Sequence, residues 1–140
     1  MEKLTLSDEE WRRRLSREEY EVLRRHGTER AWTGCHVGAK EPGTYACAGC
    51  GNPLFRSGEK FESGTGWPSF TRPVSPEAVV TVADRSHGMT RTEVRCARCD
   101  GHLGHVFPDG PPPTHLRYCM NSVAMRHRPD AAAPGLTPPP

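Results

Sequence analysis

The sequence predicts a mainly β domain of antiparallel strands, stapled by a four-cysteine zinc site and preceded by short N-terminal helices. Three observations predict it. Two capping-box patterns stand near the N-terminus, short β-rich segments separated by turn residues fill 43–125, and two C-x-x-C motifs lie within that stretch. No segment of 43–125 sustains a helical period, so we expect a β core with long loops.

Two short helices are expected near the N-terminus. The S-x-x-E pattern occurs at Ser7–Glu10 and at Ser16–Glu19, where a serine hydroxyl and a glutamate carboxylate can satisfy the free amides of a first helical turn. Spacings of three or four residues then give each helix a narrow apolar stripe, formed by Trp11 with Leu15 and by Tyr20 with Leu23. We expect these stripes to pack against the sheet and to take no part in chemistry.

The segments expected as strands are short and rich in β-branched and aromatic residues. Residues 78–82 are apolar except for Thr81, which predicts a buried strand, and residues 92–95 alternate less cleanly. The full set comprises 44–47, 78–83, 92–96, 105–107 and 117–125.

The chain of 140 residues is of ordinary size for one domain, which we place at 1–125. Residues 1–42 hold the helices and a loop, and 43–125 form the zinc-bound β core. Residues 126–140 are rich in Pro and Ala and lack periodicity, which predicts a disordered tail. The apolar content of 34%, with 14 prolines and 14 glycines, favours a loop-rich fold that an internal cross-link would stabilise.

Charge and composition argue against several classes of partner. Nineteen basic and seventeen acidic residues are interspersed and give a net charge of +2, so no nucleic-acid surface is indicated. The charged N-terminal stretch has no apolar export region, and no apolar run approaches the length of a membrane span. We therefore expect a cytoplasmic protein, whose cysteines serve metal binding or thiol chemistry and not disulfide staples.

The motifs Cys47-Ala-Gly-Cys50 and Cys96-Ala-Arg-Cys99 are paired metal knuckles. Two residues between cysteines let both sulfurs of a tight turn face one ion, and two such turns complete a tetrahedral site. Because four thiolates leave no open coordination position, we expect one structural zinc ion that ties two distant hairpins together. The alternatives are two redox-active C-x-x-C pairs or buried free cysteines.

Two cysteines, Cys35 and Cys119, remain outside the knuckles. Cys119 lies in R117-Y-C-M-N-S122, where the period of two in a strand would put Arg117 and Asn121 on the same face as the thiol. A nearby cation favours the thiolate, which is the nucleophilic form. A buried cysteine acting only as a small apolar residue is an equally weighted alternative.

Two histidines and a tryptophan could complete a site. His102 and His105 follow the second knuckle and could exchange protons near neutral pH, although a surface or hydrogen-bonded core position would also explain them. Trp67 lies in G64-T-G-W-P-S-F70, where the glycines could expose its ring, but a core tryptophan is the more usual role.

These motifs together resemble the B-type methionine sulfoxide reductases, the peptide-methionine (R)-S-oxide reductases. The resemblance covers about 6–125 and includes the S-D-E-E-W pattern from Ser7 and D84-R-S-H-G-M89. It rests chiefly on the GTGWPSF element, the two C-x-x-C pairs, H102-L-G-H-V-F-P-D-G110 and R117-Y-C-M-N-S122. It implies two antiparallel sheets, a monomer, and reduction of methionine (R)-sulfoxide, free or in oxidised proteins.

The resemblance also implies roles for particular residues. Cys119 would attack the sulfoxide sulfur and become a sulfenic acid. His102 and His105 would assist proton transfer, and Asn121 would help to place the thiolate or a water molecule. Trp67 and Phe107 would form the apolar wall for the substrate's S-methyl group.

One position departs from the pattern. Many family members carry the resolving cysteine between the glycines of the GWPSF element, where this chain has Thr65. We therefore predict that Cys35, in the glycine-flanked loop T33-G-C-H-V-G38, attacks the sulfenic acid to form a Cys35–Cys119 disulfide, which thioredoxin then reduces. The alternative is a bystander Cys35, with thioredoxin or a small thiol attacking the sulfenic acid directly.

Two other functions compete with this interpretation. A zinc-stapled binding module would need an exposed basic and aromatic cluster, which the mixed charge does not favour. A thiol peroxidase would use Cys119 but would need neither Trp67 nor a preference for the R epimer.

Overall fold

The computed structural model of the chain describes residues 2–130. Within them it contains helices α1 (Asp8–Arg14) and α2 (Arg17–Leu23) and three short 3-10 turns, at Ser57–Glu59, Ser86–Gly88 and Ser122–Ala124. The strands are β1 (Gly43–Cys47), β2 (Pro53–Arg56), β3 (Lys60–Phe61), β4 (Ser69–Phe70), β5 (Val79–Asp84), β6 (Arg91–Cys96), β7 (His102–Phe107), β8 (Arg117–Met120) and β9 (Met125–Pro129).

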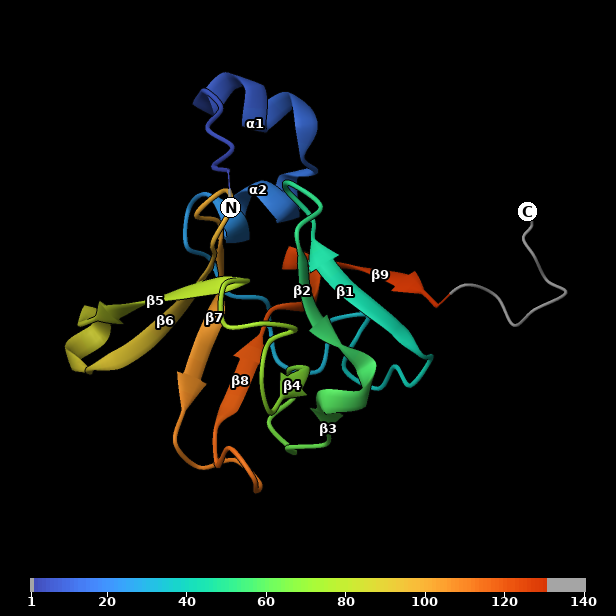
Figure 1. Cartoon of the computed structure of the whole chain (residues 1–140). Coiled ribbons are helices and arrows are strands. Elements are labelled where there is room, and N and C mark those ends of the chain that lie inside the picture. Colours follow the sequence, from blue (N-terminus) through green and yellow to red (C-terminus); the bar gives the residue numbers. More distant parts are fainter. Residues whose placement is uncertain (1, 131–140) are drawn as a thin grey trace, which may run out of the picture.

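The strands form two antiparallel sheets, which confirms the predicted fold class (Figure 1). The smaller sheet has the order β2-β1-β9, and the larger has the order β3-β4-β8-β7-β6-β5. An aromatic cluster joins them: the Phe55 and Phe70 rings stack at 4.5 Å between centroids, and Tyr45 meets Phe70 edge-on at 5.2 Å. Because Tyr45 and Phe55 belong to the small sheet and Phe70 to the large one, the core lies between the two sheets.

Both predicted helices begin with complete capping boxes. Ser7 and Ser16 each accept a hydrogen bond from the backbone amide three residues later, and the glutamate side chains return the contact. The predicted stripe residues Trp11, Leu15, Tyr20 and Leu23 are all buried. The two helices lie together at one end of the molecule, beside the turn that joins β1 to β2 (Figure 1).

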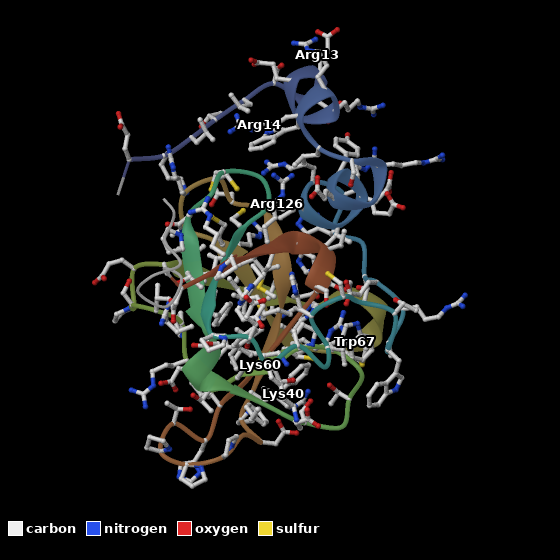
Figure 2. All side chains as sticks on the ribbon, turned by 90° about the vertical axis from the view of Figure 1, so that its right-hand side faces the viewer. Arg13, Arg14, Lys40, Lys60, Trp67 and Arg126 are labelled. Atoms are coloured by element: carbon white, nitrogen blue, oxygen red, sulfur yellow. The ribbon has the colours of Figure 1, made fainter. Side chains whose placement is uncertain are left out.

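This helical end covers the C-x-x-C turns. Gly49 lies so close to the Trp11 ring that an added Cβ would stand 3.2 Å from it, and a Cβ on Gly101 would stand 2.9 Å from Leu23. Arg24 donates a hydrogen bond of 2.9 Å to the Cys99 carbonyl. Arg13 and Arg14 mark this end in Figure 2, and Trp67 lies in the other half of the molecule.

The prediction that residues 78–82 form a buried strand is wrong about the burial. β5 spans Val79–Asp84 at the edge of the large sheet, pairs with β6 alone among the described strands, and leaves Val80 40% exposed. An apolar run fits a strand buried on both faces, but a sheet edge also tolerates β-branched residues that face solvent on one side.

The expected disordered tail begins too early. Residues 126–129 belong to β9, which pairs with β1 from Gly43↔Pro129 to Cys47↔Met125 and completes the small sheet. The polar, Arg-rich sequence of this strand hides it, because an edge strand needs only one apolar face. The rest of the expected tail, from 131, lies outside the described residues.

Within residues 2–130, no helix has both the length and the apolar composition that crossing a bilayer requires.

Candidate active site and metal cluster

The four knuckle cysteines come together as predicted. Their sulfur atoms all lie within 4.8 Å of one another, with 3.7 Å between the Cys47 and Cys99 sulfurs and 3.5 Å between those of Cys50 and Cys96. Tetrahedral coordination with metal–sulfur bonds of about 2.3 Å places sulfurs about 3.8 Å apart. The cluster therefore fits a tetrahedral ion bound by four thiolates.

The two knuckles are built alike. In the first, the Cys47 amide donates to the Asn52 carbonyl and the Gly51 amide donates to the Cys47 carbonyl. In the second, Cys96 and Asp100 make the same two bonds, with Gly101 as the outer partner. The residue after each second cysteine has positive φ, +81° at Gly51 and +62° at Asp100, which explains the glycine in one knuckle and the turn-favouring aspartate in the other.

Polar donors also reach the sulfurs. The Gly49 amide donates to Cys47 Sγ at 3.4 Å, and Asn52 Nδ2 donates to Cys96 Sγ at 3.6 Å. Such bonds stabilise thiolate charge around a metal site. Since the first knuckle follows β1 and the second follows β6, the cluster links the two sheets.

Cys119 lies on β8 at the wall of a second feature, a cavity of about 300 Å³ that we call the catalytic cavity. In the sheet, Cys119 stands directly opposite His105 of β7 and Ser69 of β4. Directly opposed residues on antiparallel strands point to the same face. The cavity is lined by Thr28, Thr65, Trp67, Gly104, His105, Phe107, Arg117, Cys119, Met120 and Asn121.

Opposing influences act on the Cys119 thiol. Burial raises its pKa, while the hydroxyl of Thr65 and the positive charge of Arg117 work in the opposite direction. Thr65 Oγ1 lies 3.8 Å from Cys119 Sγ. The site therefore holds a thiol that needs a partner to become a thiolate near neutral pH.

Arg117 is fixed as well as charged. It makes two bonds to the Asp109 carboxylate, at 2.9 and 3.1 Å, and its guanidinium stacks 4.4 Å above the Phe107 ring. Arg117 and Cys119 both line this cavity, so they share one face of the strand as predicted, and Phe107 lies beneath the cation.

Trp67 forms part of the cavity wall and is held by its indole. Its Nε1 donates to the Glu29 carbonyl at 3.0 Å. The Glu29 amide in turn donates to Asn121 Oδ1 at 2.9 Å, and Glu29 Oε1 accepts from the Val123 amide at 3.0 Å. One residue of the N-terminal loop thus ties the wall to the chain that leaves β8.

A β-bulge brings the two histidines to one side of the sheet. Residues three apart on a regular strand point to opposite faces. Here Val94 pairs with Gly104 and Arg95 with His102, so Leu103 is an extra residue in β7. The His102 and His105 rings consequently stand 5.5 Å apart, and both border a polar chamber of about 310 Å³.

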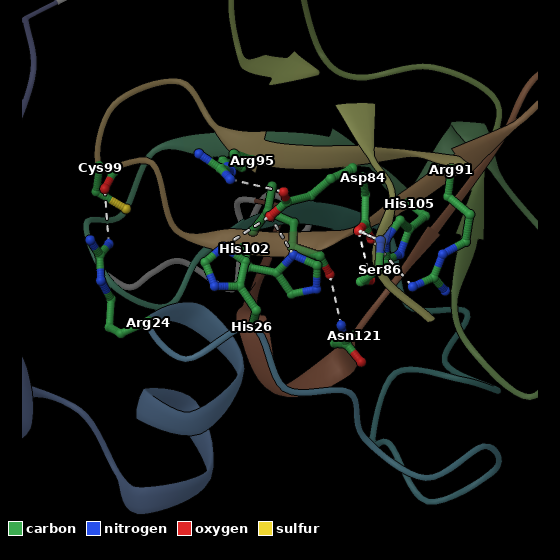
Figure 3. Close-up of polar contacts among 12 residues, drawn as sticks. Arg24, His26, Asp84, Ser86, Arg91, Arg95, Cys99, His102, His105 and Asn121 are labelled. Atoms are coloured by element: carbon green, nitrogen blue, oxygen red, sulfur yellow. Dashed lines mark hydrogen bonds and ion pairs between the residues drawn. The ribbon is translucent and has the colours of Figure 1, made fainter. Parts of the chain in front are cut away.

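Each histidine has its own carboxylate (Figure 3). His102 Nδ1 lies 2.8 Å from Glu93 Oε2, and His105 Nε2 lies 2.8 Å from Asp84 Oδ2. His26 also approaches Glu93 at 3.3 Å. Of the two histidines, His105 borders both the polar chamber and the catalytic cavity, while His102 is 3% exposed and borders the chamber alone.

Burial sets the charge state of His102, and hydrogen bonding sets that of its partner Glu93. It lowers the pKa of His102, against the opposing effect of Glu93. Burial alone would raise the pKa of Glu93, but hydrogen bonds from Arg95 and His102 lower it overall. The pair therefore favours an ionised Glu93 and a neutral His102.

Asn121 lines the catalytic cavity just beyond the end of β8, with its amide already engaged. Its Nδ2 donates to the Leu103 carbonyl at 3.0 Å, and its Oδ1 accepts from the Glu29 amide. Its buried side chain thus fixes the bulged strand and the N-terminal loop.

Cys35 is exposed and does not line the catalytic cavity. It borders a larger cavity of about 780 Å³ between α2 and the loop that follows it, together with Gly34, Ser122 and Val123. The structure therefore does not bring the two leftover thiols into one cavity.

Four polar residues of the site escaped the sequence interpretation: Asp84, Glu93, Asp109 and Glu29. Glu93 offered a signal, because a carboxylate inside a short β-branched strand needs a buried partner. Asp84 begins D-x-S, in which the aspartate side chain accepts from the backbone two residues on, a turn pattern that could have fixed the end of the strand. Glu29 acts mainly through its backbone and gave no signal.

The comparisons with known proteins agree on one family. The SelR domain family matches residues 15–129. A peptide methionine sulfoxide reductase MsrB of Agrobacterium fabrum is 56% identical over 127 residues, which cover 91% of this chain and 94% of that protein. A protein of the same name from Pseudomonas fluorescens is 58% identical over 125 residues, which cover 89% of this chain and 96% of that protein. Another, from Leifsonia xyli subsp. xyli, is 59% identical over 125 residues, which cover 89% of this chain and 90% of that protein.

Proposed function

The chain belongs to the SelR-domain family of B-type methionine sulfoxide reductases, and from this premise we propose that Cys119 is the nucleophile with which it reduces methionine (R)-sulfoxide. The observation that carries the assignment is the position of this thiol in the catalytic cavity. It stands opposite His105 in the sheet, and the Trp67 wall borders the same space.

In the first half-reaction the Cys119 thiolate attacks the sulfoxide sulfur. The sulfur–oxygen bond breaks, the oxygen passes to Cys119 with a proton, and methionine leaves, so that the sulfoxide is reduced and the thiolate becomes a sulfenic acid. Arg117 and the Thr65 hydroxyl favour the thiolate. Trp67 and Phe107 receive the S-methyl group, and an apolar wall opposite polar groups can distinguish the two epimers.

In the second half-reaction the Cys35 thiol attacks Cys119 Sγ. A disulfide forms, and hydroxide leaves and takes a proton to become water. The two thiols start in different cavities, so the loop of Cys35 moves before the sulfurs meet. Thioredoxin then reduces the disulfide by dithiol exchange. We expect the chain to act as a monomer that repairs oxidised proteins in the cytoplasm.

The metal that the four knuckle cysteines would hold is zinc, in a structural role. Cys47, Cys50, Cys96 and Cys99 supply four thiolates at tetrahedral spacing, a donor set that zinc favours and that leaves no position for substrate. Metal analysis of the purified chain by mass spectrometry should find one zinc per chain, and a stoichiometric iron content would contradict the assignment.

The function is tested with the two epimers of methionine sulfoxide. The reduced wild-type chain should release methionine from the R epimer and not from the S epimer. Cys119→Ser should release none and should keep its metal and its melting temperature. Turnover by the serine variant above that of a mock purification would refute the assignment of the nucleophile.

The resolving step has its own variant. Cys35→Ser should keep the first turnover and activity with dithiothreitol but lose most thioredoxin-linked turnover. Peptide mapping of the oxidised wild type should find a Cys35–Cys119 disulfide. Equal thioredoxin-linked rates in variant and wild type would instead mean that the reductant attacks the sulfenic acid directly.

A further inference from the structure

Asp84 is a fully engaged carboxylate that lines the polar chamber, to which His105 also belongs. Its Oδ1 accepts from the Ser86 amide at 2.9 Å and from the Ser86 hydroxyl at 2.7 Å. Its Oδ2 receives Arg91 Nη2 at 3.2 Å and lies 2.8 Å from His105 Nε2 (Figure 3). Four contacts from three residues hold this group at the end of β5.

These contacts decide the tautomer of His105. The Ser86 hydroxyl and amide, followed by His105, hold the pKa of Asp84 well below its ordinary value, so the group is a carboxylate near neutral pH. A carboxylate can only accept hydrogen bonds. The short contact therefore requires a proton on His105 Nε2, which leaves the lone pair of the neutral ring on Nδ1.

The reaction needs such a lone pair. Burial raises the pKa of Cys119, so the thiol must give up its proton before it attacks, and the sulfoxide oxygen must later receive one. His105 stands directly opposite Cys119 across the sheet and borders the same cavity. It is the histidine placed to carry that proton in both directions.

We infer that Asp84 is the third member of a Cys119–His105–Asp84 triad, a positioning residue that commits Nε2 of His105 and reserves Nδ1 for the reaction. This inference rests on the proposed role of Cys119. Nδ1 takes the proton from the Cys119 sulfur, giving thiolate and imidazolium, and returns it to the oxygen as the sulfur–oxygen bond breaks. Asp84 stays ionised throughout and stabilises the imidazolium, following the general logic of nucleophile, base and orienting group.

The neighbouring carboxylate–histidine pair serves as an internal contrast. His102 binds Glu93 through Nδ1, the opposite ring nitrogen, and does not border the catalytic cavity. The two histidines are therefore not equivalent. His105 carries the proton, and His102 with Glu93 supports the bulged strand.

The first test reads the tautomer directly. Nitrogen-15 NMR of the reduced wild-type chain should show the neutral His105 ring protonated at Nε2 and His102 protonated at Nδ1. In Asp84→Asn, which is nearly equal in size, the His105 preference should be lost because an amide can present either its oxygen or its NH₂ group. A wild-type His105 protonated at Nδ1 would overturn the inference without any variant.

The second test measures the first turnover. With free methionine (R)-sulfoxide and no reductant, Asp84→Asn should release methionine about 10²-fold more slowly than wild type. The matched control is Asp130→Asn, which removes an exposed carboxylate that pairs with Arg56 and should stay within about twofold of wild type.

The outcomes distinguish a failure of the triad from a failure of the proposed function of Cys119. A slow Asp84→Asn with an altered His105 tautomer supports the triad. A slow variant whose His105 tautomer is unchanged, or an Asp84→Asn at wild-type rate, overturns it. Retained activity in Cys119→Ser would instead refute the proposed function, whatever Asp84 does.

Discussion

Cysteine has different surroundings at the two ends of this molecule. At the helical end, four cysteines have mainly one another as neighbours, and Trp11 and Leu23 cover their turns. In the catalytic cavity, Cys119 has a hydroxyl, a guanidinium and an imidazole around it, and the described lining residues include no second thiol. The comparison indicates that the surroundings of a thiol, and not the thiol itself, would separate the metal ligands that we propose from the proposed nucleophile.

The sharpest test of the helical end removes one ligand. Cys47→Ser should lose the metal and show no cooperative melting transition, because structural zinc contributes about 10–16 kcal/mol of binding free energy against a total stability of about 5–15 kcal/mol. Metal analysis and circular dichroism measure both. Cys35→Ser, the exposed control, should keep metal and transition, and a folded, metal-loaded Cys47→Ser would break the comparison.

Of the two catalytic-cavity residues Trp67 and Arg117, we expect the larger effect from replacing Trp67, which forms part of the cavity wall. Trp67→Ala should lower kcat/KM for methionine (R)-sulfoxide about thirtyfold, equivalent to about 2 kcal/mol, because the S-methyl group loses an aromatic face. Trp67→Phe keeps a face but loses the bond to the Glu29 carbonyl, and should fall about fivefold. Melting should stay cooperative in both, and an unchanged kcat/KM in the alanine variant would remove Trp67 from the site.

A smaller effect should follow from removing the positive charge of Arg117 from the catalytic cavity. Arg117→Met removes the cation that opposes the upward pKa shift of Cys119, so the thiol should titrate at still higher pH. At pH 8 the alkylation of Cys119 by iodoacetamide should slow about tenfold, and the midpoint of its pH profile should rise. Arg126→Met, which removes a cation paired with Glu19 far from this thiol, is the control and should change neither.

We expect the smallest effect from a substitution at the helical end. Ser16→Ala removes the α2 cap and should lower the free energy of unfolding by about 1 kcal/mol, measured by urea titration. The alanine variant should reduce methionine sulfoxide at the wild-type rate. A loss of catalysis as large as that of Trp67→Ala would show that the two ends are coupled and do not work separately.

The features that the sequence predicted correctly depend on interactions between residues that are close together in the chain. Both capping boxes and the two knuckles depend on residues a few positions apart, so their spacing alone predicted them. Cys119 and Arg117 share a strand face for the same reason. The family resemblance supplied the histidines and Trp67, which spacing alone had left open.

What could not be predicted depends on how strands meet. The bulge at Leu103 places His102 on the same side of the sheet as His105, and only the pairing with β6 reveals it. Asp84 reaches His105 from a strand two places away in the sheet, and Glu29 contributes backbone groups that any residue would possess. No local pattern encodes these contacts.

The pairing of β9 with β1 has a consequence for synthesis on the ribosome. β1 is made early and β9 last among the described strands, so until residue 129 emerges the small sheet is only the β1–β2 hairpin. An isolated two-stranded hairpin is marginally stable in water. We therefore expect the nascent chain to gain protease resistance in one late step, and a chain truncated before Met125 to stay protease-sensitive even though it contains every cysteine.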